Sequence, residues 1–175
     1  PLWYGVTNPD IVEWPAANDI NIISLGLRPM IRTVMDRYGA VRARLGKPDT
    51  TLRGVGRHVV VADSDEAALA IARRAYPRWR ESFRWLFARH GAEPRVIGIY
   101  PPSFDELMAL DNGIAGSPAT VRDFIAAESA ATGANYMLSW FAFGDMTLDE
   151  SLHSVELFAR EVMPAFADTR AAAAE

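Results

Sequence analysis

The chain alternates strand-like with helix-like segments, and this alternation restricts its fold more than any other feature of the sequence. Short runs rich in aromatic and β-branched residues predict four strands, at 1–6, 20–25, 57–63 and 135–143. Capped or amphipathic segments predict the helices, at 9–18, 29–45, 64–88, from 118 onward and from 147 onward. A helix after each strand indicates a parallel sheet with crossover connections.

Four parallel strands are too few to close a barrel, because a (β/α)8 barrel needs eight strands and roughly 250 residues. The chain has 175 residues, which suits one domain or a large part of one. We therefore predict an α/β fold that forms a (βα)4 half of a TIM barrel. Such a half leaves two strand edges and one face of the core open, so its stability requires a missing half, a second copy or rearrangement into an open sheet.

Prolines and apolar runs refine these elements. Both terminal runs, at 1–6 and 135–143, are expected to be buried strands. Pro15 predicts a kink or a late start of the first helix, and Pro77 predicts an interruption of the helix at 64–88. Apolar steps of three and four residues predict buried faces on two helices. These residues are Ile31, Val34, Met35, Tyr38, Val41 and Leu45, and then Leu148, Leu152, Val155, Phe158 and Val162.

The chain is expected to hold one domain at 1–168, followed by an alanine-rich tail at 169–175 that frays. Prolines and weak periodicity mark 89–112 as an irregular insertion.

Composition and charge exclude several kinds of chemistry. Cysteine is absent, which excludes disulfides, thiolate nucleophiles and cysteine-ligated metals. The net charge is −4 and the arginines are scattered among acids, so no nucleic-acid-binding surface is indicated. No apolar run approaches the roughly 20 residues of a membrane helix, and no leader pattern occurs. We therefore expect a cytoplasmic protein that binds neither nucleic acid nor membranes.

Histidines are few, and no known catalytic motif surrounds them. The chain has three histidines without metal-ligand spacing, and it contains no HExxH, P-loop, GxSxG or GxGxxG motif. We expect no metal site. His58 follows Arg57 on a predicted strand, so one of the two side chains must face the barrel interior. An interior His58 would be a candidate to contact substrate or act as a base, and the alternative is a hydrogen-bonded core histidine.

Two helix starts could bind an anion. Asn8 precedes Pro9, and Gly116-Ser117 precedes Pro118, the pattern of a capped helix with proline at its first position. Free N–H groups and the positive end of the helix dipole favour phosphate at such a terminus. Both Asn8 and Ser117 have the alternative role of a simple helix cap.

Three segments resemble bacterial-luciferase-like flavin monooxygenases. The segment 3–9, with Glu13-Trp14, resembles the passage from the fifth barrel strand into its helix. The segments 115–121 and 158–164 resemble the family's Gly-Thr/Ser-Pro helix start and its terminal helix. The three segments occur in consistent order and spacing over most of the chain.

This resemblance implies the C-terminal half of a TIM barrel that uses reduced FMN, or a deazaflavin in some relatives. It implies oxidation of a small organic substrate with molecular oxygen, a separate flavin reductase and frequent dimerisation. It places part of the flavin phosphate site at Val6, Thr7 and Asn8, with Gly116 and Ser117 as further candidates. The insertion at 89–112 would cover the flavin as a lid.

The resemblance also implies that the residues for oxygen chemistry lie largely on the first four strands, which nothing in this chain matches. We therefore expect little turnover by the chain alone. A separate chain could carry the N-terminal half. The competing hypothesis is a non-catalytic half-barrel that dimerises as a binding or structural module, with a vestigial flavin site. A third is an unrelated open sheet that binds a small anion.

Overall fold

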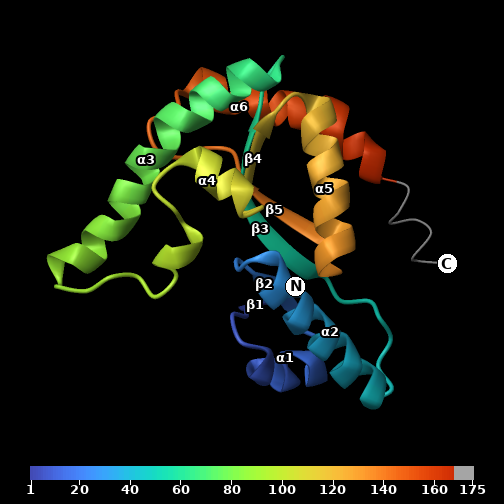
Figure 1. Ribbon diagram of the computed structural model, residues 1–175. Helices are drawn as coiled ribbons and strands as arrows, with labels where there is room; N and C mark the ends of the chain where they lie inside the picture. Colours follow the sequence, from blue (N-terminus) through green and yellow to red (C-terminus); the bar gives the residue numbers. More distant parts are fainter. Residues whose placement is uncertain (168–175) are drawn as a thin grey trace. The chain divides into compact units, whose positions relative to one another are not determined.

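The computed structural model describes residues 1–167, so the predicted tail at 169–175 lies outside the described residues. The chain divides into two compact units (Figure 1). Unit 1 comprises Pro1–Arg57 and Ile125–Ser139, and unit 2 comprises His58–Phe124 and the chain from Trp140 onward. Two strands and one helix contribute residues to both units.

Unit 1 is a sheet covered by helices. Its strands are β1 (Trp3–Gly5), β2 (Asn21–Ser24), the first half of β3 (Arg53–Val61) and β5 (Tyr136–Trp140). Strands β1, β2 and β3 pair in parallel in that order, and β5 also pairs with β3. Its helices are the 3-10 turn at Pro9–Ile11, α1 (Glu13–Ala17), α2 (Arg28–Arg44) and the second half of α5 (Pro118–Thr132). Figure 1 shows α1 and α2 beside β1 and β2.

The core of unit 1 lies between this sheet and its helices. Ile22 and Val55 of the strands are buried in one cluster with the apolar face of α2. The Tyr38 hydroxyl in this cluster donates a 2.8 Å hydrogen bond to the carbonyl oxygen of Ile20. Four other side chains line a hollow of about 260 Å³, which we call the open face of unit 1: Trp3, Ile23, Tyr136 and Leu138.

Unit 2 contains a second parallel strand pair. The second half of β3 pairs with β4 (Gly113–Gly116), in register from His58 opposite Gly113 to Val61 opposite Gly116. The helical elements are α3 (Asp65–Arg89), a 3-10 turn at Ile97–Ile99, α4 (Phe104–Ala109), the first half of α5, α6 (Leu148–Leu157), a π-helix at Phe158–Val162 and a 3-10 turn at Met163–Phe166. Its core joins small residues of α3 to large rings, which are Tyr76 of α3 itself and Tyr100, Phe104 and Phe143 of the following segments.

The structure confirms a parallel α/β sheet with crossover helices, and it adds one strand that was not predicted. Strand β4 has four residues, two of them glycines, and glycine weakens a strand pattern. A Cβ at Gly113 would lie 2.7 Å from Leu107 Cδ2 and 3.3 Å from the His58 carbonyl oxygen. The close approach of α4 and β3 therefore requires glycine at position 113. The same glycine weakens the strand pattern, which is why β4 was not predicted.

The two helix prolines have different outcomes. Helix α1 begins late, at Glu13, which confirms the late start and places Pro15 in a first turn where its missing N–H leaves no intrahelical bond unmade. The predicted interruption at Pro77 is wrong, because α3 runs from Asp65 to Arg89 with Pro77 inside it. Burial of Ala68, Ala72, Ala75 and Tyr76 stabilises this helix and offsets a local cost of about 3 kcal/mol.

Several apolar residues are more exposed than predicted. All three residues of β1 are exposed, and Tyr136 and Leu138 of β5 are each 40% exposed, so neither strand is buried throughout. Leu45 follows the end of α2 and is 46% exposed. On α6, Leu148, Leu152 and Val155 are exposed, whereas Ser154 and Leu157 face the core. We call these three the α6 stripe.

Candidate functional site

His58 of β3 is enclosed by aromatic rings in unit 2. It is 1% exposed, and five ring centroids lie within about 6 Å of the imidazole centroid. Helix α3 supplies two of these rings, and the segments after α3 and at the end of β5 supply the others. The distances are 4.3 Å to Trp79, 5.0 Å to Trp140, 5.0 Å to Phe143, 5.7 Å to Tyr76 and 6.0 Å to Tyr100. We call these five residues the aromatic box.

Three buried polar atoms at the aromatic box make no hydrogen bond in the described part of the chain. Both ring nitrogens of His58 and the hydroxyl of Tyr76 lack a hydrogen-bond partner among residues 1–167. Burial lowers the pKa of His58 from 6.5 to about 3, and burial likewise raises the pKa of the Tyr76 hydroxyl. His58 is therefore neutral near pH 7, and its low pKa makes it a weak base. Contact with a ligand stays a prediction that requires the aromatic box to open.

The first predicted phosphate site, at Val6, Thr7 and Asn8, lies in unit 1. Val6 is fully buried in the core, and its N–H donates a 2.8 Å hydrogen bond to the Ile23 carbonyl oxygen. Asn8 caps the 3-10 turn, since its Oδ1 accepts a 2.9 Å bond from the Asp10 N–H. The Thr7 hydroxyl and Asn8 Nδ2 are exposed donors with no partner in the part of the chain that the structure describes.

The helix behind Asn8 is shorter than predicted. A three-residue 3-10 turn and the five-residue α1 replace the expected helix at 9–18. Fewer aligned peptide dipoles favour an anion less, so side-chain donors matter more at this place.

The second predicted phosphate site, at Gly116 and Ser117, lies in unit 2 and is bound by a carboxylate of the protein. Asp65 Oδ1 accepts a 2.6 Å bond from the Ser117 N–H and a 2.8 Å bond from the Thr120 hydroxyl. The backbone N–H of Ser117, followed by the Thr120 hydroxyl, holds the pKa of Asp65 below its usual value. A Cβ at Gly116 would lie 3.0 Å from the same Asp65 oxygen. A phosphate here would have to displace Asp65.

Asp65 was missed as a site residue, although its position carried a signal. Ser64-Asp65-Glu66 reads as the start of α3, and the Ser64 hydroxyl does cap that helix by accepting from the Ala67 N–H. Periodicity assigns Asp65 to a helix N-terminus but does not indicate that it also reaches the next helix start. Parallel pairing of β3 and β4 could have found this, because it brings the carboxyl ends of both strands together.

A buried ion pair in unit 1 was also missed. Arg57 and Glu128 are both fully buried, and Arg57 Nη2 donates to Glu128 Oε1 at 2.6 Å. Arg57 Nη1 donates to the carbonyl oxygens of Gly26 and Gly56. Arg28 Nε donates to the second oxygen of Glu128 at 2.8 Å. Neither the position of Glu128 on α5 nor its spacing from Arg57 indicates this contact in advance.

The segment predicted as a lid is attached at several points within unit 2. Arg73 binds Asp105 through two nitrogens, and Arg84 binds Glu93. Arg80 Nε of α3 also donates a 2.7 Å bond to the Tyr100 carbonyl oxygen, and within the segment itself the Asn112 side chain donates a 2.7 Å bond to the Ile99 carbonyl oxygen. A covering role over a flavin stays a prediction.

Residues 1–167 contain neither a membrane-spanning helix nor a cluster of metal-binding side chains. Among them no helix is both long and apolar enough to cross a bilayer. In the same range no three histidine, aspartate or glutamate side chains are grouped so as to hold a metal ion.

Comparison with known proteins finds half-length matches. No family model matches the chain. An uncharacterised protein of Sinorhizobium fredii, y4wF, is 28% identical over 165 residues, which cover 93% of this chain and 48% of that protein. The chain thus spans about half the length of the curated relative that it matches.

Solved structures of similar fold include two monooxygenases and a coenzyme F420-dependent reductase. The monooxygenase RslO1 of Streptomyces bottropensis is 20% identical with a TM-score of 0.73, over 94% of this chain and 48% of that one. The oxygenating constituent of 3,6-diketocamphane monooxygenase of Pseudomonas putida, solved with FMN, is 21% identical with a TM-score of 0.66. The match covers 93% of this chain and 47% of that one. The coenzyme F420-dependent tetrahydromethanopterin reductase of Methanopyrus kandleri is 16% identical with a TM-score of 0.60. The match covers 95% of this chain and 51% of that one.

These likenesses establish the fold. The chain has the architecture of about half of a TIM barrel, with parallel strands and crossover helices. This agrees with the (βα)4 prediction from the alternation of strands and helices.

Proposed function

We propose that this chain supplies the C-terminal half of a luciferase-like, flavin-dependent monooxygenase that oxidises a small organic substrate. The observation that carries this proposal is the match of 94% of the chain to 48% of the RslO1 monooxygenase. The neighbour with bound FMN and the F420-dependent neighbour support a flavin-type cofactor, with FMN as our choice and a deazaflavin as the alternative. A separate reductase would supply the reduced flavin.

The donors on this chain fit a flavin phosphate best at Thr7 and Asn8. The Thr7 hydroxyl and Asn8 Nδ2 are exposed, and both lack a hydrogen-bond partner among the described residues. Ser117 fits less well, since Asp65 already accepts its N–H and like charges repel. When bound, reduced flavin would supply the electrons that activate molecular oxygen. Neutral His58 could donate one hydrogen bond and accept another once the aromatic box opens.

Two exposed apolar surfaces support a partner for this half. In unit 1, Trp3, Tyr136 and Leu138 of the open face are each at least 37% exposed. In unit 2, Leu148 and Leu152 of the α6 stripe are 73% and 50% exposed. Exposed groups of large apolar side chains mark surfaces that other proteins cover. An N-terminal half-barrel, on the same or another polypeptide, would cover both, and the assembly would dimerise as such enzymes commonly do.

Flavin binding by the purified chain tests the proposal. FMN fluorescence is titrated with wild-type protein, with Asn8→Ala and with Asn8→Asp. Loss of Nδ2 in Asn8→Ala should weaken binding by about 1–3 kcal/mol, the scale of a hydrogen bond to a charged group. Asn8→Asp keeps an oxygen for the cap but repels phosphate, so it should bind FMN less tightly than Asn8→Ala.

A cap variant elsewhere provides the control. Thr147→Ala removes the side-chain cap of α6 and should change stability but not FMN affinity. Equal FMN affinity for all four proteins would remove Asn8 from the site. Absence of any FMN binding would count against the enzyme and favour the second candidate.

The second candidate is a non-catalytic half-barrel that dimerises as a binding module. The observation favouring it is the Asp65 carboxylate at the Ser117 N–H, where the family resemblance implies an anion. A colourless dimer that ignores FMN is the result expected for this module. Native mass spectrometry of the natural gene product gives its oligomeric state and shows whether an N-terminal half accompanies this chain.

A further inference from the structure

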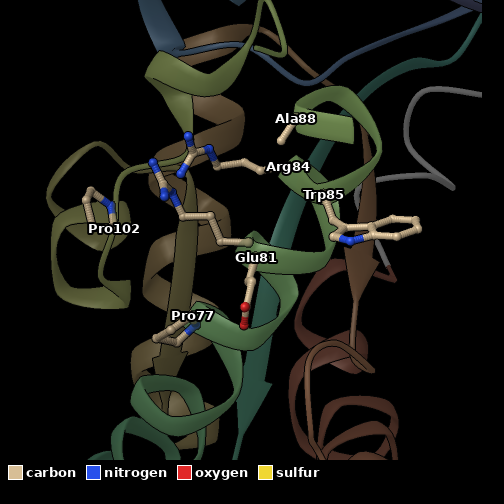
Figure 2. A pocket seen from close by; sticks show the side chains of 7 residues that line it. Pro77, Glu81, Arg84, Trp85, Ala88 and Pro102 are labelled. Carbon is tan, nitrogen blue, oxygen red and sulfur yellow. The ribbon is translucent and has the colours of Figure 1, made fainter. Parts of the chain in front are cut away.

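A hollow on the C-terminal part of α3 combines apolar walls with two guanidinium groups. It has a volume of about 350 Å³ and lies within unit 2 (Figure 2). Its apolar lining comes from Pro77, Trp85, Ala88 and Pro102, and its charged lining from Arg80, Glu81 and Arg84. The volume is within the usual range for sites that bind small molecules, roughly 300–1,000 Å³.

Arg80 has hydrogen-bonding capacity left. Its Nε donates a 2.7 Å bond to the Tyr100 carbonyl oxygen, which orients the guanidinium plane. Its two terminal nitrogens make no hydrogen bond among residues 1–167. The Arg84 guanidinium, with a smaller contribution from the charge of Arg80, holds the pKa of the Glu93 carboxyl below its usual value, so Glu93 acts on both arginines. A half-buried guanidinium held in this way presents two donors in a fixed plane, the arrangement that recognises a carboxylate through two bonds.

Arg84 adds a second charge under the control of a neighbour. Glu93 binds Arg84, and this contact raises the pKa of the guanidinium. In Figure 2 the Arg84 side chain extends toward the side of the hollow where Pro102 lies, whereas the Glu81 carboxylate points away from it. Glu81 therefore does not neutralise the donors at this end, and Glu93 competes with an incoming anion for Arg84.

We propose that this hollow binds an organic carboxylate with an apolar body, recognised by Arg80 and assisted by Arg84. The carboxylate lies on the terminal nitrogens of Arg80, and the hydrocarbon or ring contacts Pro77 and Pro102. This site is independent of the proposed flavin function, because it uses neither Thr7 nor Asn8 and needs no partner half.

Benzoate tests the proposal, with benzamide as its uncharged analogue and inorganic phosphate as an anion without an apolar body. Binding is followed by the fluorescence of the tryptophans, which include Trp85 in the wall of the hollow. Benzoate should saturate the signal, and benzamide and phosphate should not. Arg80→Gln should weaken benzoate binding by about ten- to a hundredfold, as expected for losing hydrogen bonds to a charged group.

Two further variants separate recognition from general charge. Glu93→Gln removes the competitor for Arg84 and should tighten benzoate binding, an effect opposite in sign to that of Arg80→Gln. Arg95→Gln removes the same charge from an exposed position outside the hollow and should leave binding unchanged. Equal binding of benzoate and benzamide, or equal losses in Arg80→Gln and Arg95→Gln, would overturn the proposal. Saturation by phosphate as strong as by benzoate would overturn the apolar part of it.

Discussion

Consecutive residues of β3, Arg57 in unit 1 and His58 in unit 2, are both buried but solve the problem of burial in opposite ways. Arg57 keeps its charge, and Glu128 and the carbonyl oxygens of Gly26 and Gly56 accept its hydrogen bonds. His58 gives up its charge instead and lies among rings with neither nitrogen bonded in the described chain. Burying a charge is costly unless it is paired, whereas an imidazole can be neutralised by a shifted pKa.

The comparison shows that the fold needs the charge of Arg57, whereas at His58 it needs a ring but no polar contact. A paired buried charge cannot be altered on one side without leaving the other unpaired. An unpaired neutral ring makes no polar contact that a substitution could break. A candidate for function is therefore better sought at His58 than at Arg57.

Removing the partner of Arg57 should have the largest effect. Glu128→Gln leaves the Arg57 guanidinium buried without a counter-ion, and we expect the free energy of unfolding to fall by about 3–5 kcal/mol. Urea denaturation followed by circular dichroism measures the loss. Asp36→Asn is the matched control, because it breaks the exposed Arg32–Asp36 pair and should change stability little. Equal losses in the two variants would mean that burial of the pair does not matter.

Arg57 and His58 also show what the sequence can predict about a side chain and what it cannot. Alternation predicts that Arg57 and His58 point to different sides of one strand, and the two side chains have different neighbours in the structure. It does not predict their partners: Glu128 lies 71 residues from Arg57 in the chain. Asp65 and Ser117, likewise, are 52 residues apart. Periodicity reports which face of an element is buried, but only the three-dimensional packing decides which distant side chain meets it.

The parts predicted well depend on local chemistry or on the strand order. The alternation of strands and helices leads to the parallel sheet, and Asn8 before Pro9 leads to the observed cap. Burial was predicted less well, because an apolar residue on an edge strand such as β1 reads like one in a core. The residues of the open face and of the α6 stripe are apolar residues of this kind, exposed although their pattern resembles that of a core. Their apolar residues are what a covering half-barrel would require.

Acid should destabilise the protein through His58 before it acts on the carboxylates. The pKa of His58 is about 3 in the folded chain and near 6.5 in the unfolded chain, so the unfolded state binds more protons between these values. Its contribution to stability is complete above pH 6.5 and is lost as the pH falls toward 3. We expect the free energy of unfolding to fall by up to about 1.4 kcal/mol per pH unit in that window.

The window can be chosen to isolate this residue. Asp65 has a pKa below its usual 3.8, so its stabilising effect is retained above that value and lost only at lower pH. Urea unfolding between about pH 6.5 and pH 4.5 therefore reports mainly on His58. His58→Phe should remove most of the slope. A slope of the same size in that variant would assign the acid sensitivity to other groups.

Replacing His58 itself should have the smallest effect on stability. His58→Phe removes two polar atoms that have no partner in the described chain and keeps a planar ring inside the aromatic box. At pH 7 the free energy of unfolding should stay within about 1 kcal/mol of wild type or rise, because an unsatisfied buried polar group is costly. A fall as large as that in Glu128→Gln would mean that the imidazole makes polar contacts that stabilise the fold.

The same variant separates packing from ligand contact at His58. His58→Ala keeps no ring and should be destabilised by the cavity it leaves, by about 2–5 kcal/mol, which shows that the aromatic box needs a filled centre. If His58 contacts flavin or substrate, His58→Phe loses affinity for FMN while its stability is retained. If His58 only packs, His58→Phe binds FMN as the wild type does. Because the stability of His58→Phe is expected to be retained whichever role His58 has, the FMN titration of this variant decides between the two roles.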